Sequence, residues 1–229
     1  MIEVLKSGGI LMIPIILCGV IATFIIIERI IYYSGLSKTD KRMYAQLNPL
    51  LEKRYFEEAL AVCRTADTPA SNVIGKILQF HDHSEEDIKD AAATEANRQL
   101  PDIDRYLTTL GTIANISTLL GLLGTVTGNI KAFGVLGAGG SMGNPAVLAG
   151  SIAEALVTTA SGLVVSIPSV IFHNFFVARS ERIVGEIESY ATDTILTVCS
   201  SQPASPAARP AAAQPVARPA APVQPGARV

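Results

Sequence analysis

Apolar residues form three long blocks in this chain, and the charged residues lie outside these blocks. The blocks cover residues 10–27, 106–130 and 155–178, and His173 is the only ionisable group in the third. An α-helix rises about 1.5 Å per residue, so a run of about 20 apolar residues crosses the hydrocarbon core of a bilayer. The pattern therefore predicts three transmembrane helices.

The first block has two interpretations, a membrane anchor and a cleaved signal peptide. A signal peptide has an apolar region of about 7–15 residues, followed by a cleavage site between small residues. The block in this chain is longer, and no such site follows it. Pro14 lies inside the block, where a membrane-spanning helix tolerates proline. We interpret the block as an anchor.

Lys and Arg are distributed unevenly around the blocks. Residues 34–105 contain ten of them, whereas residues 132–153 contain none. Basic residues near transmembrane helices favour the cytoplasmic side. The pattern predicts a periplasmic N-terminus and a cytoplasmic loop and C-terminus. We expect Lys131 to extend outward from the end of the second span.

The polar stretch between the first two spans predicts a helical stalk in the cytoplasm. Apolar residues at spacings of three and four predict helices over residues 55–64 and 72–80. Ser84 begins a capping-box pattern for a third helix over residues 85–100. We expect this helix to continue into the second span with a bend at Pro101. A small separate helical domain is the alternative.

The predicted fold is all-α: an integral membrane protein with three transmembrane helices, a cytoplasmic helical stalk and a disordered Pro/Ala tail. The tail contains seven Pro and ten Ala in residues 202–229 and cannot bury a core. In chain order the segments are a periplasmic N-terminus (1–9), transmembrane helix 1 (10–33), a cytoplasmic loop (34–105), transmembrane helix 2 (106–133), a periplasmic turn (134–145), transmembrane helix 3 (146–178), a cytoplasmic helix (179–200) and the tail (201–229).

Composition excludes several functional classes. The chain is 49% hydrophobic and only 17% charged, with a mean hydropathy of +0.38. Its net charge of −2 offers no basic surface for nucleic acid. Cys18, Cys63 and Cys199 lie far apart and form no pair typical of a disulfide framework or zinc site. Since no nucleophile–base pair, phosphate-binding loop or metal cluster is evident, we expect neither an enzyme nor a cofactor.

Glu154 is the only acidic residue between positions 132 and 178. A helix that begins at Pro145 places it about two and a half turns inside the third span. A carboxylate within a span costs about 2.5–3.5 kcal/mol, so it should face protein or water, where it is suited to proton transfer. The alternative is a structural group or a side chain that reaches the outer interface. Because one acid makes no complete path, further copies or a partner must complete it.

Small residues follow one side of the second span. For the glycines among them we favour close helix packing. Thr118 and Thr125 have two open interpretations: each hydroxyl lines a hydrated path, or it bonds back to its own helix. In the third span Thr158 shares the side of Glu154, whereas Thr159 lies about 140° away on an ideal helix. The stripe in the second span consists of Gly111, Ala114, Thr118, Gly121, Thr125, Gly128 and Ala132.

Three segments resemble the MotA/TolQ/ExbB proton-channel family. Residues 119–128 (LLGLLGTVTG) are similar to its second-span motif. Residues 152–163 (IAEALVTTASGL), with Asn174 and the Ile-Pro pair at 167–168, are similar to its third-span motif. Residues 8–29 are similar to the first span of ExbB-type members. MotA proteins have four spans, so three spans favour the ExbB/TolQ branch.

The resemblance implies a homo-oligomer in the bacterial inner membrane, expected to be a pentamer. It would surround the single-span helices of an ExbD/TolR-type partner, whose membrane aspartate supplies the missing carboxylate. Proton flow would then drive mechanical work on a TonB/TolA-type protein, with energised outer-membrane import as the expected task. A stator for motility or envelope constriction is a related alternative, and a membrane scaffold with a structural Glu154 is an alternative of another class.

By motif, Glu154, Thr125 and Thr159 match the pore-lining positions of the family. Thr158 stands where the family commonly has a small apolar residue. Its added hydroxyl leaves sodium open as the coupling ion. Thr118 completes the set of candidate residues along the ion path.

Overall fold

The computed structural model describes residues 9–138 and 145–200, and every regular element in these ranges is a helix. The predicted N-terminal segment up to residue 8, the centre of the predicted turn (139–144) and the Pro/Ala tail (201–229) lie outside the described residues. The helices are α2 (Met12–Glu52), α3 (Phe56–Ala66), α4 (Pro69–Gln79), α5 (Glu85–Ile103), α6 (Leu107–Ala138) and α7 (Pro145–Cys199).

The prediction of an all-α fold with three membrane-spanning helices is confirmed. Helix α2, the α5–α6 segment and α7 each contain a stretch long and apolar enough to cross a bilayer. Helix α7 begins at Pro145, as predicted, and α6 continues to Ala138, beyond the expected end of the second span at residue 133. The membrane boundaries themselves remain a prediction.

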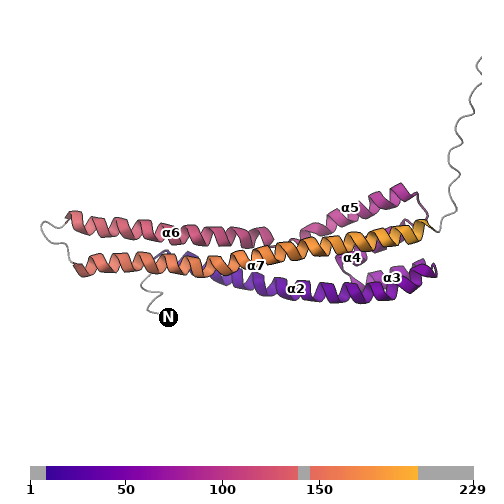
Figure 1. The fold of residues 1–229 in the computed structure, drawn as a ribbon, viewed down its shortest axis with the longest axis horizontal. Coiled ribbons are helices and arrows are strands. Elements are labelled where there is room, and N and C mark those ends of the chain that lie inside the picture. Colours follow the sequence, from indigo (N-terminus) through magenta and orange to yellow (C-terminus); the bar gives the residue numbers. More distant parts are fainter. Residues whose placement is uncertain (1–8, 139–144, 201–229) are drawn as a thin grey trace, which may run out of the picture.

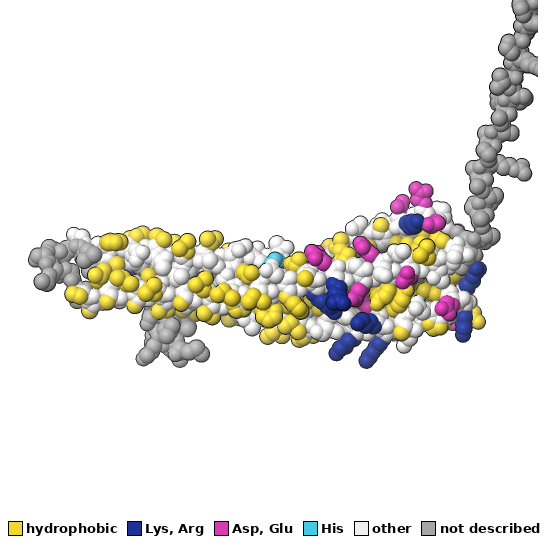
Figure 2. All heavy atoms as spheres, viewed as in Figure 1, with side chains coloured by type: hydrophobic (Ala, Val, Ile, Leu, Met, Phe, Trp, Pro, Cys, Tyr) yellow, Lys and Arg dark blue, Asp and Glu magenta, His cyan; other side chains and the backbone are white. Residues whose placement is uncertain are grey.

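The molecule is elongated and has two chemically different halves. Figure 1 shows α6 beside the N-terminal half of α7, while α3, α4 and α5 gather with α2 around its C-terminal half. On the face shown in Figure 2, the charged side chains lie in the half formed by the shorter helices. The α6–α7 half exposes large apolar side chains such as Leu119, Phe133 and Val164. An apolar exterior of this kind is suited to lipid or to other transmembrane helices.

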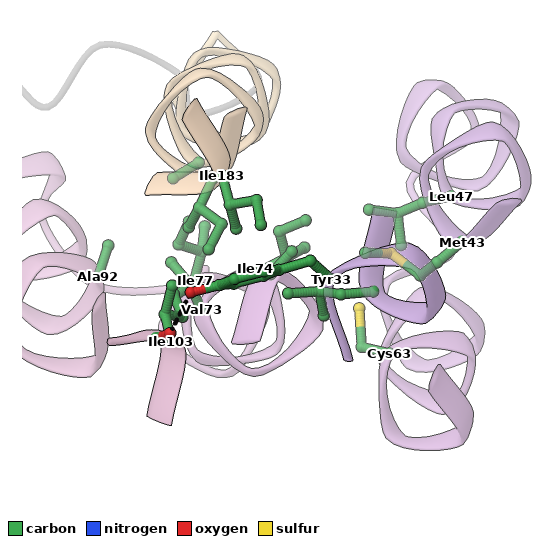
Figure 3. Packing of buried hydrophobic residues seen from close by; sticks show 14 of the residues in the cluster. Tyr33, Met43, Leu47, Cys63, Val73, Ile74, Ile77, Ala92, Ile103 and Ile183 are labelled. Atoms are coloured by element: carbon green, nitrogen blue, oxygen red, sulfur yellow. Dashed lines mark hydrogen bonds between the residues drawn. The ribbon is translucent and has the colours of Figure 1, made fainter. Parts of the chain in front are cut away.

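The hydrophobic core lies in the polar half, around α4. Figure 3 shows Ile74 and Ile77 from α4 beside Tyr33 from α2 and Ile183 from α7. Helix α4 begins with a capping box in which the Thr68 hydroxyl accepts a hydrogen bond from a backbone N–H and so stabilises its first turn. The expected helices at 55–64, 72–80 and 85–100 are all present as α3, α4 and α5.

The N-terminus of α5 forms as its sequence predicts. Ser84 accepts a hydrogen bond from the backbone N–H of Asp87 over 3.2 Å. Its hydroxyl also donates to the Asp87 carboxylate at 2.6 Å. The local Ser-x-x-Asp pattern therefore fixes where this helix begins.

The C-terminus of α5 corrects the prediction of one helix continuing into the second span. Helix α5 ends at Ile103, and α6 begins at Leu107 after Tyr106, which has a positive φ of 65°. The Arg29 guanidinium of α2 donates hydrogen bonds to the carbonyls of Asp102 (3.3 Å) and Ile103 (3.2 Å). The Tyr33 hydroxyl donates to the same Ile103 carbonyl at 2.8 Å, the dashed line in Figure 3. These side chains satisfy the last carbonyls of α5, so the helix can stop there.

Small residues let α6 and α7 approach each other closely. A Cβ atom added at Gly128 would lie 2.5 Å from the Cβ of Ala155. One added at Gly162 would lie 2.5 Å from the carbonyl oxygen of Ser117, and one at Gly124 would also meet an α7 side chain at 2.5 Å. Distances this short are not accessible to real methyl groups. The packing interpretation of the second-span glycines is confirmed at Gly124 and Gly128.

Substituting Gly162 tests this close contact. We expect Gly162→Ala to destabilise the protein by about 1–3 kcal/mol, because the new methyl group meets backbone atoms that cannot move aside. Gly150→Ala is the matched control in the same helix, since a Cβ there meets nothing within 4 Å. The control should be neutral or stabilising by about 0.5–1 kcal/mol, the ordinary gain of Ala over Gly in a helix. The measurement is the unfolding free energy of both variants in detergent. Equal effects would show that α6 and α7 do not touch at Gly162.

Asp40 is a buried carboxylate in the polar half of the molecule. It is 6% exposed, and its Oδ1 atom has no hydrogen-bond partner among the described residues. Burial raises the pKa of Asp40, a hydrogen bond from the Thr68 side chain opposes the rise, and the nearby Glu186 of α7 adds to it. The folded protein therefore binds a proton at Asp40 more tightly than the unfolded chain does.

This raised pKa predicts how stability changes with pH. The stability linked to Asp40 is fully present below the unfolded pKa of 3.8 and is lost as pH rises through the folded value. We expect Asp40→Asn to stabilise the protein at pH 7, with a gain that shrinks as pH falls toward 4. Asp90→Asn, at an exposed position, is the control. Unfolding free energies across this pH range are the measurement, and a gain that stays constant with pH would contradict the assignment.

Candidate functional site

Glu154 forms an ion pair with Lys131 across the α6–α7 contact. The Nζ atom of Lys131 lies 2.7 Å from Oε1 of Glu154. The Glu154 side chain is 27% exposed and that of Lys131 is 57% exposed. The pair therefore lies at the edge of the helix contact, where both groups remain accessible from one side of the chain.

The backbone near the start of the described chain closes over the same carboxylate. Gly9 has a positive φ of 66°, and a Cβ atom added there would collide with the carboxylate of Glu154. A residue with a side chain would be strained by this backbone and would have no space. Glu154 is thus approached from its own helix, from α6 and from the segment before α2.

Thr158 and Thr159 both contact α6. The Thr158 side chain is 1% exposed and packs on Gly124, while its hydroxyl donates to the Glu154 carbonyl at 2.8 Å. The Thr159 hydroxyl donates to the Gly121 carbonyl of α6 at 2.7 Å. Although Thr159 and Glu154 lie about 140° apart on an ideal helix, both bond to α6.

The two threonines of α6 differ in their partners. The Thr125 hydroxyl donates to the Leu122 carbonyl of its own helix at 2.7 Å. The Thr118 hydroxyl donates to the Ser166 hydroxyl of α7 at 2.7 Å and also lies 3.2 Å from its own helix at Ala114. The alternative of bonding to its own helix therefore describes Thr125, while Thr118 also links the two helices. Their role along an ion path stays a prediction.

At the other end of the α6–α7 pair, polar bonds fix the register of the two helices. The Nδ1 atom of His173 lies 3.0 Å from the Leu107 carbonyl in the first turn of α6. Seven residues further along α7, the Ser180 hydroxyl donates to the Asp104 carboxylate. Together with the Thr118–Ser166 bond, these contacts align α6 and α7 along their length.

The structure corrects the prediction for Lys131. The sequence predicts that its side chain extends outward, whereas in the structure it pairs with Glu154. The position of each residue along its helix could have predicted this pair. Lys131 precedes the end of α6 by seven residues, and Glu154 follows the start of α7 by nine. In two antiparallel neighbouring helices these positions lie within about one turn of each other. The residues that the structure describes contain no cluster of three or more His, Cys, Asp or Glu suited to a metal ion.

Comparison with known proteins shows the family to which the chain belongs. Residues 65–189 match the model of the MotA/TolQ/ExbB proton channel family. A putative biopolymer transport protein ExbB-like 3 of Synechocystis sp. is 29% identical over 171 residues, which are 74% of this chain and 81% of that protein. A putative ExbB homolog of Methanothermobacter thermautotrophicus is 28% identical over 188 residues, 82% of this chain and 66% of the homolog.

A TolQ protein is also similar over a shorter stretch. The Tol-Pal system protein TolQ of Pseudomonas aeruginosa is 36% identical over 108 residues, 47% of this chain and 46% of that protein. The family match covers more than half of the chain and includes the whole α6–α7 contact with Glu154. With its three membrane-spanning apolar helices, the chain is a multi-pass inner-membrane protein that belongs to the MotA/TolQ/ExbB proton channel family, in its ExbB/TolQ branch.

Proposed function

We propose that this chain is the proton-conducting subunit of an ExbB–ExbD/TolQ–TolR-type complex, which converts proton motive force into mechanical work. The observation that carries the proposal is the carboxylate of Glu154, which lies within the apolar α6–α7 pair yet remains partly exposed. A carboxylic acid in such a place can bind and release a proton while the surrounding helices exclude bulk water. No enzymatic step is part of this function.

The hydroxyl groups near Glu154 serve in this proposal to hold the site in shape. Thr158 is bonded to the Glu154 carbonyl, and Thr159 is bonded to the α6 backbone. We expect Thr118 and Thr125 of α6 to lie along the ion path. Their hydroxyls bond to the Ser166 hydroxyl and to the Leu122 carbonyl, respectively. A rotation of α7 against α6 would break the Thr159–Gly121 and Thr118–Ser166 bonds, so these two threonines couple proton binding to helix position.

A second carboxylate must complete the route. Between residues 106 and 178 Glu154 is the only acidic residue, and residues 10–27 contain none. We infer that a single-span ExbD/TolR-type partner supplies it, at the centre of a ring of copies of this chain, expected to be a pentamer. The exposed apolar side chains of α6 and α7 are suited to such neighbours. The names of the relatives, biopolymer transport protein ExbB and Tol-Pal system protein TolQ, support this choice.

The proposed topology places the α3–α5 half in the cytoplasm and the segment before α2 in the periplasm. The basic residues of the loop support this orientation. A proton crossing a potential of 100 mV then releases about 2.3 kcal/mol, enough to bias one step of a rotation. The work would be passed to a TonB/TolA-type protein. We propose outer-membrane import as the task because ExbB-named relatives match over more of the chain than TolQ does.

A membrane scaffold is the second candidate, and the Lys131–Glu154 ion pair favours it. An ion pair can hold two helices together without carrying a proton. In that case Glu154 would be structural, and the helical stalk would recruit partners. The two functions differ in what the loss of the carboxyl group does to proton flux.

Glu154→Gln separates the two candidates. We expect it to lower proton flux through the complex, purified by a tag on this chain and reconstituted in liposomes, by about 100-fold or more, because an amide cannot carry the proton. Glu188→Gln, at an exposed position of α7 in the polar half, should conduct like the unmodified complex. The size of the assembled particle is measured in parallel. Proton flux at the unmodified level in a correctly assembled Glu154→Gln complex would support the scaffold.

A further inference from the structure

Lys131 is the only Lys or Arg between residues 106 and 178, and Glu154 is the only acid there. The structure brings these two groups together at 2.7 Å. We propose that Lys131 is a tethered counter-ion that occupies the cation position at Glu154, so that the site accepts protons and excludes sodium. This inference rests on the proposed function of Glu154 as the proton carrier, and it assigns the choice of coupling ion to one residue.

A sodium ion at Glu154 would bind a carboxylate whose charge the Lys131 ammonium already balances. Hard cations are held by several oxygen ligands at once, and the carboxylate would be the first of them. Its Oε1 atom is paired with the Lys131 ammonium, and the Gly9 backbone closes over the same atom. The charge that would attract a sodium ion is therefore balanced, and the space beside Oε1 is taken by the ammonium and the Gly9 backbone.

The two threonine hydroxyls nearest in sequence to Glu154 are held in place by bonds to backbone carbonyls. Thr158 is buried, and its hydroxyl donates to the Glu154 backbone carbonyl. The Thr159 hydroxyl is bonded to the Gly121 carbonyl. The added hydroxyl of Thr158, which left sodium open when the sequence alone was considered, is thus used in a bond within its own helix.

A proton can use this site without displacing an ion of similar size. It binds to the Glu154 carboxylate, forms an O–H bond and leaves the carboxyl group neutral. The Lys131 ammonium, which is more than half exposed on a flexible stem, is then released toward water. When the proton leaves, the ammonium returns to the carboxylate. One proton is bound and one is released, and the charge of the pair alternates between zero and +1.

Few of the charged groups that the structure describes lie near this pair. Up to residue 178, helices α6 and α7 contribute only Lys131, Glu154 and, far along the pair, His173, which bonds to the start of α6. The apolar part of α2 contributes none up to Glu28. The response of the site to pH and to sodium is therefore assigned to Lys131 and Glu154 themselves.

The test measures proton flux through the reconstituted complex while sodium replaces choline in the buffer. We expect the unmodified complex and Lys131→Arg to be insensitive to sodium, because both keep a tethered cation. Lys131→Met should conduct protons in choline, but its proton flux should fall about tenfold in sodium, because the cation position at Glu154 is now free. The pH profile of Lys131→Met should also shift, whereas that of Lys131→Arg should not. A Lys131→Met complex that is insensitive to sodium and has the pH profile of the unmodified complex would overturn the inference.

Two further measurements keep the result interpretable. Glu154→Gln conducting normally would overturn the proposed function itself, whereas a silent Glu154→Gln with an unaltered Lys131→Met overturns only the role of Lys131.

If Lys131→Met fails to assemble, the unmodified chain is treated with a carbodiimide, which reacts with carboxyl groups, in the presence of sodium or choline. We expect sodium not to protect Glu154 from modification. Protection by sodium would show that the ion reaches the carboxylate despite Lys131, and would overturn the inference.

Discussion

The close contact between α6 and α7 is the interaction on which the site depends. Gly128 and Gly162 allow one helix to lie against the backbone of the other. At this separation the Thr159 hydroxyl reaches a carbonyl of α6, and the Lys131 ammonium reaches the carboxylate of Glu154. Because lipid gives little hydrophobic drive for helix association, close packing and polar bonds must supply it. The features that join the helices thus also build the candidate proton site.

The two halves of the molecule are held together by different forces. In the half around α4, Ile74 and Ile183 are removed from solvent, and burial of apolar surface stabilises the bundle. In the α6–α7 half the large apolar side chains point outward. Arg29 and Tyr33 lie where the halves meet and bind the last carbonyls of α5. This junction joins the chain just before α6 to α2. The position of this end of the α6–α7 pair relative to α2 is therefore fixed.

Local signals in the sequence predicted those features that local physics determines. The apolar blocks gave the spans, Ser84 gave the start of α5, and Pro145 gave the start of α7. The glycines of the second span gave its packing face. The motifs around Gly124 and Glu154 identified the family, since residue types and spacing are themselves the motif.

The features that the sequence did not predict depend on residues far apart. At the break between α5 and α6, the last carbonyls of α5 bind Arg29, more than seventy positions away. The Lys131–Glu154 pair requires the register of two helices joined by residues outside the described ranges. Asp40 could have been found, because it is a polar residue at a core position among the three-and-four spaced residues of α2, such as Leu36 and Met43. Its consequence for stability, however, follows from burial by α4 and α7.

The most direct test of the account is whether Lys131 and Glu154 touch in the membrane. A carbodiimide activates a carboxyl group and joins it to an amine in contact with it, without adding a spacer. Native membranes treated in this way can be digested, and the joined peptides identified by mass spectrometry. The account predicts an amide bond between Lys131 and Glu154 within a single chain. Modification of Glu154 with no bond to Lys131, or a bond from Lys131 to a different carboxylate, would contradict it.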